Sequence, residues 1–206
     1  MLFSKADLAV LHTTRRDTLK QILRTLNTAA YDHYTSRIKT NESITNKLAR
    51  KQLEPTVENA MQHLNDIIGI RIVTHYIHEV YTVVNLLKQE FDIQEECDYI
   101  AKPKASGYRS YHLILRVPVS KTSIPFPYAD HMTVEIQIRT MGMDFWASLE
   151  HSLVYDRTKT AGTLMPDSLS LVHNELLNYA DNIFSIDMRI QALQHLTEET
   201  MPNTKE

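Results

Sequence analysis

Glycine is scarce in this sequence, and its scarcity excludes a common kind of nucleotide site. Only four glycines occur in 206 residues, at the separated positions Gly69, Gly107, Gly142 and Gly162. Loops that cradle phosphates with backbone N–H groups need several glycines close together, so neither a dinucleotide-binding motif nor a P-loop is present. If the protein binds phosphorylated ligands, side-chain cations must hold the phosphates.

Cysteine, long apolar runs and excess positive charge are also lacking. The single cysteine, Cys97, can close no disulfide within the chain and cannot form a thiolate metal cluster, which indicates a reducing compartment. No segment has the roughly 18 uncharged apolar residues of a membrane span, and no signal peptide is recognisable, so we expect a cytoplasmic protein without a membrane partner. The net charge of −3 provides no overall basic field for duplex nucleic acid.

The apolar pattern predicts one folded unit with an appended helical piece, because a chain of this length can bury one substantial core. Helical spacing predicts helices over residues 5–34, 43–53, 55–64, 75–91, 142–155 and from 166 to about 200. Strands are predicted at residues 66–73, 110–117 and 132–139, with a proline-containing loop over 121–130. This order predicts an α+β fold, a mixed β-sheet flanked by α-helices with a C-terminal helical extension.

The last predicted strand carries a row of polar side chains. Within residues 133–139, Glu135, Gln137 and Arg139 alternate with apolar residues, so they share the face directed away from the core. A solvated face would explain this row by itself. A dense group of functional side chains follows in residues 143–155, however, and this favours a site.

Asp66 and Arg71 place opposite charges beside or within an otherwise apolar strand, where an unpaired charge would be costly. One interpretation is an internal salt bridge. The other pairs Asp66 with Glu135 of a neighbouring strand as a two-carboxylate Mg²⁺ site, because this ion prefers oxygen ligands from protein, phosphate and water. The spacing alone favours neither interpretation.

Two groups of cations are candidates to hold phosphates. In the first, Lys47, Arg50 and Lys51 share one helix face, and Arg37 and Lys39 precede them. Such a run is usually a solvated surface, but in a chain without a glycine-rich loop it is the obvious candidate for binding a triphosphate, and Arg can also stack on a purine.

The second group lies in residues 98–112, where Lys104, Tyr108, Arg109 and His112 crowd one loop before a strand. Together they offer a ring for stacking and cations for phosphates.

Five segments carry a family resemblance: residues 36–39 (SRIK), 66–72 (DIIGIRI), 106–112 (SGYRSYH), 135–140 (EIQIRT) and 143–153 (MDFWASLEHSL). In this order they resemble the synthetase domain of the RelA/SpoT alarmone family, over about residues 35–155. The last segment is especially similar to the single-domain small alarmone synthetases. The resemblance implies a nucleotidyltransferase-like fold and a GTP pyrophosphokinase, which moves the β,γ-pyrophosphoryl group of ATP to the ribose 3′-hydroxyl of GDP or GTP and releases AMP.

The resemblance also implies a role for each candidate residue. Adenine would be sandwiched by Arg37 and Arg71, and the ATP phosphates would be bound by Lys39, Lys47 and Arg50. Mg²⁺ would be held by Asp66 and Glu135, and Glu135 would also help to deprotonate the attacking hydroxyl. Tyr108 would stack on guanine, and the rest of the acceptor site would be formed by Lys104, Arg109, His112, Gln137, Arg139 and His151.

The same resemblance suggests how the chain is organised and regulated. Residues 1–160 would form the synthetase domain with its N-terminal helices, and residues 161–206 a helical segment that assembles a homotetramer. The long family members carry a hydrolase domain with a His-Asp metal motif, and no such dipeptide occurs here, so we expect synthesis without hydrolysis. The alarmone itself and single-stranded RNA are candidate regulators.

Two alternatives stay open at this point. The first is a toxic relative that pyrophosphorylates the 3′ end of tRNA or adenosine nucleotides. The second is a non-catalytic RNA-binding regulator that keeps the fold without the activity. The intact set of Asp66, Arg71, Tyr108 and Glu135 argues against the second, and the lack of a strongly basic overall charge argues against tRNA.

Overall fold

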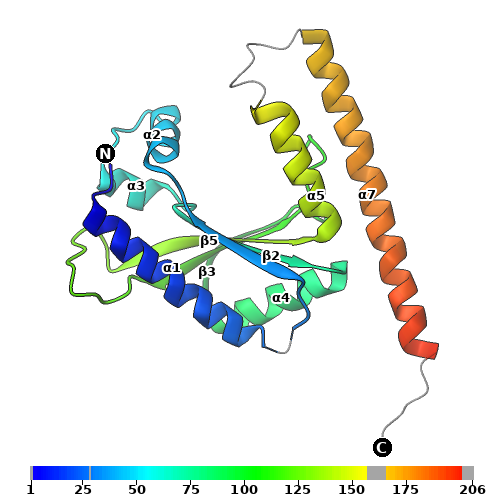
Figure 1. Ribbon diagram of the computed structural model, residues 1–206, viewed down its shortest axis with the longest axis horizontal. Helices are drawn as coiled ribbons and strands as arrows, with labels where there is room; N and C mark the ends of the chain where they lie inside the picture. Colours follow the sequence, from blue (N-terminus) through cyan, green and yellow to red (C-terminus); the bar gives the residue numbers. More distant parts are fainter. Residues whose placement is uncertain (1, 28, 157–165, 201–206) are drawn as a thin grey trace, which may run out of the picture.

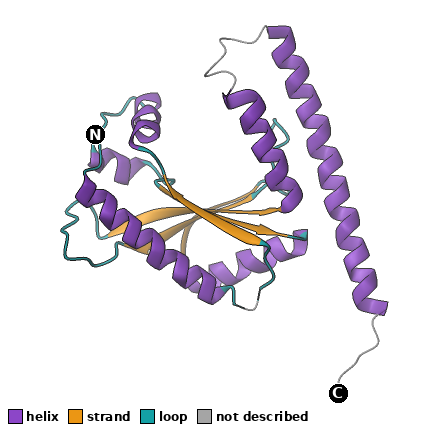
Figure 2. Cartoon of the chain, viewed as in Figure 1, coloured by secondary structure: helices purple, strands orange, loops and turns teal. Residues whose placement is uncertain are grey.

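A five-stranded mixed β-sheet forms the centre of the protein (Figures 1 and 2). The computed structural model describes residues 2–27, 29–156 and 166–200. The strand order is β1-β2-β5-β4-β3; β2 and β5 are parallel and the other neighbours are antiparallel. The strands are β1 (His33–Ile38), β2 (Ile68–Thr74), β3 (Asp92–Asp98), β4 (Tyr111–Pro118) and β5 (His131–Thr140).

Two helices cover one face of this sheet, and further helices stand at the two ends of the opposite face (Figure 1). The covering helices are α1 (Lys5–Thr25) and α4 (Ile77–Glu90), and the helices α2 (Asn41–Arg50) and α3 (Val57–His63) stand at one end. At the other end α5 (Met141–Glu150), continued by the π-helix η1 (His151–Asp156), packs against α7 (Pro166–Thr200). The predicted fold class, a mixed sheet flanked by helices, is confirmed.

The main core lies between the sheet and the covering helices α1 and α4, and it follows from the alternation seen in the sequence. Every second residue of β2 and β5 is buried, and six apolar ones are at most 1% exposed, namely Ile68, Ile70, Ile72, Val134, Ile136 and Ile138. Val80, Val83 and Leu87 of α4 are fully buried on the same side. Removing this apolar surface from water is the main stabilising term, and it leaves the opposite face of the strands for polar side chains.

Hydroxyl side chains fix the starts of four helices. Ser4 forms a reciprocal capping box with Asp7, and the other three caps accept a backbone N–H three residues ahead: Thr40, Thr56 and Thr140. Each such cap contributes about 1 kcal/mol because it satisfies a backbone donor that has no partner within the helix. Thr140 matters most for the site, because it joins β5 directly to α5.

Two strands are missing from the sequence-based prediction, and the first helix is predicted too long. α1 ends at Thr25, and residues 33–38 form β1, so the helix predicted over residues 5–34 is too long and Arg37 lies in a strand that was not predicted. β1 and β3 are edge strands whose side chains are mostly exposed, so they lack the apolar signal that revealed the inner strands. Pro55 lies outside α3, which begins after its cap Thr56.

A small second apolar cluster holds α7 against the rest of the chain. It is centred on Trp146 of α5, which is 2% exposed and donates a hydrogen bond from Nε1 to the carbonyl of Leu176 at 2.8 Å. Thr140 donates a hydrogen bond to the buried carboxylate of Asp187, so the α5 cap is tied to α7 as well. Burial raises the pKa of Asp187, and the bond from Thr140 offsets only part of that rise.

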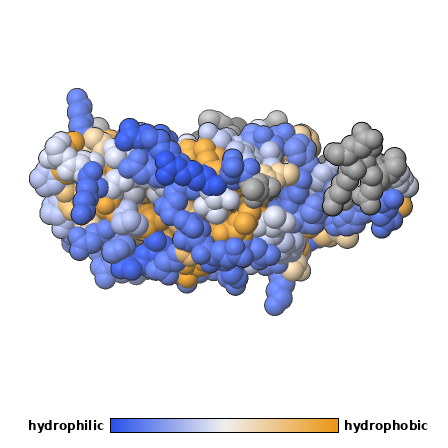
Figure 3. All heavy atoms as spheres, turned by 90° about the horizontal axis from the view of Figure 1, so that it is seen from below, coloured by the Kyte–Doolittle hydropathy of each residue, from blue (hydrophilic) through white to orange (hydrophobic). Residues whose placement is uncertain are grey.

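The hydropathy of the surface differs between the side covered by α1 and α4 and the helix α7. Seen from below, the molecule is mostly hydrophilic, with separate apolar patches (Figure 3). α7 in contrast leaves large apolar side chains exposed along its length, among them Leu171, Ile186, Ile190, Leu193 and Leu196. In the described ranges no helix combines the length and hydropathy needed to cross a bilayer.

Candidate active site

The polar face of the sheet gathers side chains from four strands. Because β2 and β5 are parallel and in register, Arg71 lies beside Gln137, and Gly69 lies beside Glu135. β1 adds Arg37 opposite Gly69, and β4 adds His112 opposite Gln137. Residues distant in the sequence therefore share one surface. The alternation in β5 predicted this only for the polar residues of that strand.

Two carboxylates form the centre of this surface. Asp66 lies just before β2, and its carboxylate forms ion pairs with the ammonium groups of Lys39 (2.6 Å) and Lys47 (2.8 Å). Burial alone would raise the pKa of Asp66, but these two ammonium groups outweigh it and hold the pKa below its usual value. The salt bridge considered between Asp66 and Arg71 is not formed.

Glu135 has a comparable environment. Its Oε2 accepts a hydrogen bond from Gln137 at 2.9 Å, and its Oε1 lies 3.4 Å from Nδ1 of His112. Burial and the negative charge of Asp66 raise the pKa of Glu135, but the contact with His112 outweighs them and the pKa lies below its usual value. Both carboxylates are therefore ionised near neutral pH and lie close enough to repel each other.

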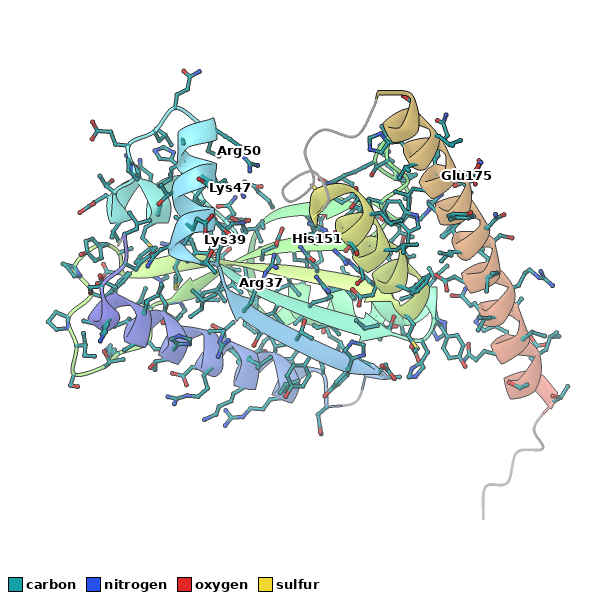
Figure 4. The ribbon with its side chains drawn as sticks, turned by 45° about the horizontal axis from the view of Figure 1, so that its top comes forward. Arg37, Lys39, Lys47, Arg50, His151 and Glu175 are labelled. Carbon is teal, nitrogen blue, oxygen red and sulfur yellow. The ribbon has the colours of Figure 1, made fainter. Side chains whose placement is uncertain are left out.

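A cationic cleft of about 500 Å³ opens beside Asp66. Figure 4 shows Arg50, Lys47, Lys39 and Arg37 following one another from α2 down to β1, with His151 across from them at the end of α5. All five side chains line this cleft. A cleft with so many cations and no glycine-rich loop is suited to a polyphosphate.

Two further hollows adjoin the cationic cleft, and shared residues join all three. Arg37 also lines a hollow of about 230 Å³ with Arg71 and Glu135. Lys47 also lines a hollow of about 200 Å³ with Asp66 and Glu135. Glu135 thus faces both hollows, and Asp66 faces the hollow that Lys47 shares with the cationic cleft.

An aromatic pocket lies beside the carboxylates, where Tyr99 and His112 line the same hollow of about 200 Å³ as Asp66 and Glu135, and Tyr108 adjoins these two rings. Tyr108, His112 and Tyr99 meet edge to face, with ring centroids 5.2 to 6.2 Å apart. The ammonium group of Lys104 lies 4.5 Å from the ring centre of Tyr99 and 4.9 Å from that of Tyr108. Rings with cations beside them are suited to stack a base and to bind its phosphates.

A chain of hydrogen bonds connects this pocket to Glu135. Arg139 donates to the hydroxyl of Tyr108, and that hydroxyl lies 2.8 Å from Nε2 of His112. If the Tyr108 hydroxyl donates to Nε2, the neutral imidazole carries its proton on Nδ1, which faces Glu135. Arg139 is only 4% exposed, so it supports this series of hydrogen bonds from a buried position.

The carboxylate pair fits a hard divalent cation. Among the described residues, no three His, Cys, Asp or Glu side chains gather as a metal site. Mg²⁺ commonly binds through one or two carboxylates and completes its shell with water and substrate phosphates, so Asp66 and Glu135 beside a cationic cleft meet that requirement.

Comparison with known proteins agrees with a site for phosphorylated ligands on this face of the sheet. Residues 36–160 match the family model described as a region found in RelA / SpoT proteins. The chain belongs to the RelA/SpoT family. The match begins within β1 and includes η1, and this part of the chain carries most of the residues described above.

Individual members of the RelA/SpoT family are similar over most of the chain. The GTP pyrophosphokinase YwaC of Bacillus subtilis is 43% identical over 152 residues, 73% of this chain and 70% of that protein. The crystal structure of small alarmone synthetase 2 of B. subtilis has a TM-score of 0.74 and 33% identity, covering 91% of this chain and 95% of that one. Small alarmone synthetase 1 of B. subtilis, bound to its product pppGpp, gives a TM-score of 0.72 and 29% identity, with 94% of both chains covered.

Two residues that the RelA/SpoT resemblance assigned to the acceptor are not gathered with the aromatic pocket. Arg109 is held against α7: it donates to the carbonyl of Ile100 at 2.8 Å, pairs with Asp181 at 3.3 Å and lies over the ring of Phe184. His151 lines the cationic cleft with the residues assigned to ATP. The other candidates lie on the shared surface or on its rim.

Two residues of the site had no role assigned from the sequence. Tyr99 completes the aromatic pocket, and Asp144 accepts contacts from Arg71 at 3.0 Å and from Arg139 at 3.1 Å. Both lie within segments that the sequence singled out. Only the spatial arrangement shows what each one touches, because their partners come from other elements.

Proposed function

We propose that the protein is a GTP pyrophosphokinase, which transfers the β,γ-pyrophosphoryl group of ATP to the 3′-hydroxyl of GDP or GTP and releases AMP. One observation carries the proposal: Asp66 and Glu135 lie between a cationic cleft and an aromatic pocket. A pyrophosphoryl transfer between two nucleotides needs two binding regions on either side of a charge-neutralising centre. The printed names of the relatives, GTP pyrophosphokinase and alarmone synthetase, support it.

The donor ATP belongs in the cationic cleft and the hollow next to it. Arg37 and Arg71 line that hollow from neighbouring strands on the same face, which suits a purine ring between two guanidinium planes. The triphosphate is bound by Lys39, Lys47 and Arg50. Lys39 and Lys47 lie between Asp66 and the cleft, so they neutralise the carboxylate and the phosphates together.

The acceptor GDP or GTP belongs in the aromatic pocket. Tyr108 stacks on guanine, and His112 and Lys104 face the acceptor from beside the ring. Gln137 and Arg139 orient these groups from the sheet. The family resemblance also assigns Arg109 and His151 to the acceptor. Arg109 lies against α7 and His151 lines the cationic cleft, so they would contact only an acceptor that extends that far.

The chemical step moves one proton and breaks one phosphoanhydride bond. The acceptor 3′-oxygen attacks the β-phosphorus of ATP, the bond from that phosphorus to the oxygen bridging the α- and β-phosphates breaks, and AMP leaves with this oxygen. Glu135, ionised because its pKa is lowered, accepts the proton of the 3′-hydroxyl. Mg²⁺ held by Asp66 and Glu135 would neutralise charge on the transferred phosphates.

The proposal also includes the oligomeric state, the location and the regulation of the enzyme. The apolar residues that α7 leaves exposed support a homo-oligomer, a tetramer assembled through this helix. Because its substrates are soluble nucleotides, we place the enzyme in the cytoplasm, and we expect it to synthesise the alarmone without hydrolysing it. Single-stranded RNA and the alarmone are the regulators to test.

A labelling experiment with several acceptors tests the reaction. The purified protein is incubated with Mg²⁺, ATP labelled on the γ-phosphate, and GDP, GTP, AMP or bulk tRNA in separate reactions, and the products are resolved. The proposal requires label on GDP or GTP with AMP released. Label only on tRNA or on adenosine nucleotides would instead establish the toxic relative, and no transfer at all would indicate a binding protein.

A further inference from the structure

We propose that Asp144 is a positioning residue that couples the donor site to the acceptor site. The proposal deepens the proposed function and rests on it. Asp144 lies in the first turn of α5, above the polar face of the sheet, and its Oδ1 contacts Nη1 of Arg71 at 3.0 Å and Nη1 of Arg139 at 3.1 Å. One carboxylate oxygen therefore joins two guanidinium groups from two different strands.

The two arginines serve different substrates. Arg71 lines the hollow proposed for adenine, on the donor side. Arg139 donates to the hydroxyl of Tyr108, and its guanidinium lies 4.9 Å from the centre of that ring, on the acceptor side. Asp144 is thus in contact with one residue of each site and with no other charged side chain that the structure describes.

Without a carboxylate between them the two guanidinium groups would repel each other. Burial and the charge of Arg139 lower the pKa of Arg71, whereas Asp144 acts in the opposite direction. This repulsion would drive the side chain of Arg71, the more exposed of the two, away from its place beside Gln137. The side chain of Asp144 is 21% exposed, so water only partly screens the pairing.

The position of Asp144 in the fold makes it a rigid support. Thr140, the last residue of β5, caps α5, so the helix start is fixed relative to Arg139, the residue just before this cap. The adjoining Met143 is 3% exposed and packs into the main core. Because one oxygen of this firmly held carboxylate contacts both arginines, a nucleotide that orders one arginine also orders the other, which lowers the cost of binding the second nucleotide.

Nucleotide binding tests the proposal independently of turnover. Titration calorimetry measures the affinity of a non-hydrolysable ATP analogue and of GDP, each alone and in the presence of the other. In the wild type each nucleotide should raise the affinity for the other. In Asp144→Asn we expect both affinities to fall by about tenfold, the loss expected for one hydrogen bond to a charged group, and this mutual effect to disappear. Asp144→Glu, which keeps the charge, should recover part of both.

Asp92→Asn is the matched control, because it removes an exposed carboxylate 3.9 Å from Arg116 at the far edge strand, outside the site. It should leave both affinities unchanged. A folded Asp144→Asn protein that binds both nucleotides like the wild type, or loses affinity for only one, would overturn the coupling role while leaving the proposed function intact. Failure of the wild-type protein to bind either nucleotide would overturn both proposals.

Discussion

Replacing Gly142 by Ala tests the docking of α7 through the sign of a stability change. Gly142 is the second residue of α5, and a Cβ there would lie 2.8 Å from Oδ1 of Asp187 and 2.8 Å from a methyl group of Ile183, both on α7. In an unobstructed helix, Ala is more favourable than Gly by about 1 kcal/mol. Overpacking costs about 1 to 3 kcal/mol, so the net expectation is a loss of up to about 2 kcal/mol.

Two measurements follow the effect of Gly142→Ala. Urea unfolding monitored by circular dichroism gives the free energy of unfolding, and the emission of Trp146, the only tryptophan, reports on contact with α7. We expect lower stability and a red-shifted emission as the indole becomes exposed. Adding Asp187→Ala, which removes the carboxylate from the clash, should restore part of the loss. A variant about 1 kcal/mol more stable than the wild type with unchanged emission would refute the docking.

Three further outcomes are expected. Tyr108→Ala should raise KM for GDP and GTP by at least about tenfold with little change in KM for ATP, in steady-state kinetics, because it removes a stacking ring. Lys47→Met should raise KM for ATP by about tenfold, in the same assay, because it removes a phosphate-binding cation. The raised pKa of Asp187 means that ionisation opposes folding, so wild-type stability should fall relative to Asp187→Asn as the pH rises above the ordinary carboxyl value of 3.8, as measured by urea unfolding; a constant difference would contradict this.

The inner part of the fold could be predicted from sequence, because burial leaves a periodic signal. Alternation marked β5 and placed Glu135 and Gln137 on its polar face, and the apolar run after Asp66 marked β2. The edge strands β1 and β3 gave no such signal, because most of their side chains face solvent on both sides.

The site was only partly predictable, for a different reason. Residue type and order identified the carboxylates and cations, but partners depend on which elements pack together. Nothing in the sequence shows that Asp66 pairs with Lys39 rather than Arg71, or that Arg109 is held by α7. The role of Asp144 likewise follows only from the parallel pairing of β2 with β5, which brings Arg71 and Arg139 under the start of α5.

The most direct test of the central claim is the rate of pyrophosphoryl transfer in Glu135→Gln beside the wild type. The glutamine keeps an acceptor oxygen toward its neighbours but removes the charge that holds Mg²⁺ and accepts the proton. We expect wild-type transfer from labelled ATP to GDP or GTP, and a fall in kcat of about 10²- to 10⁴-fold in the variant with its fold retained. A folded Glu135→Gln protein that transfers at the wild-type rate would contradict the account.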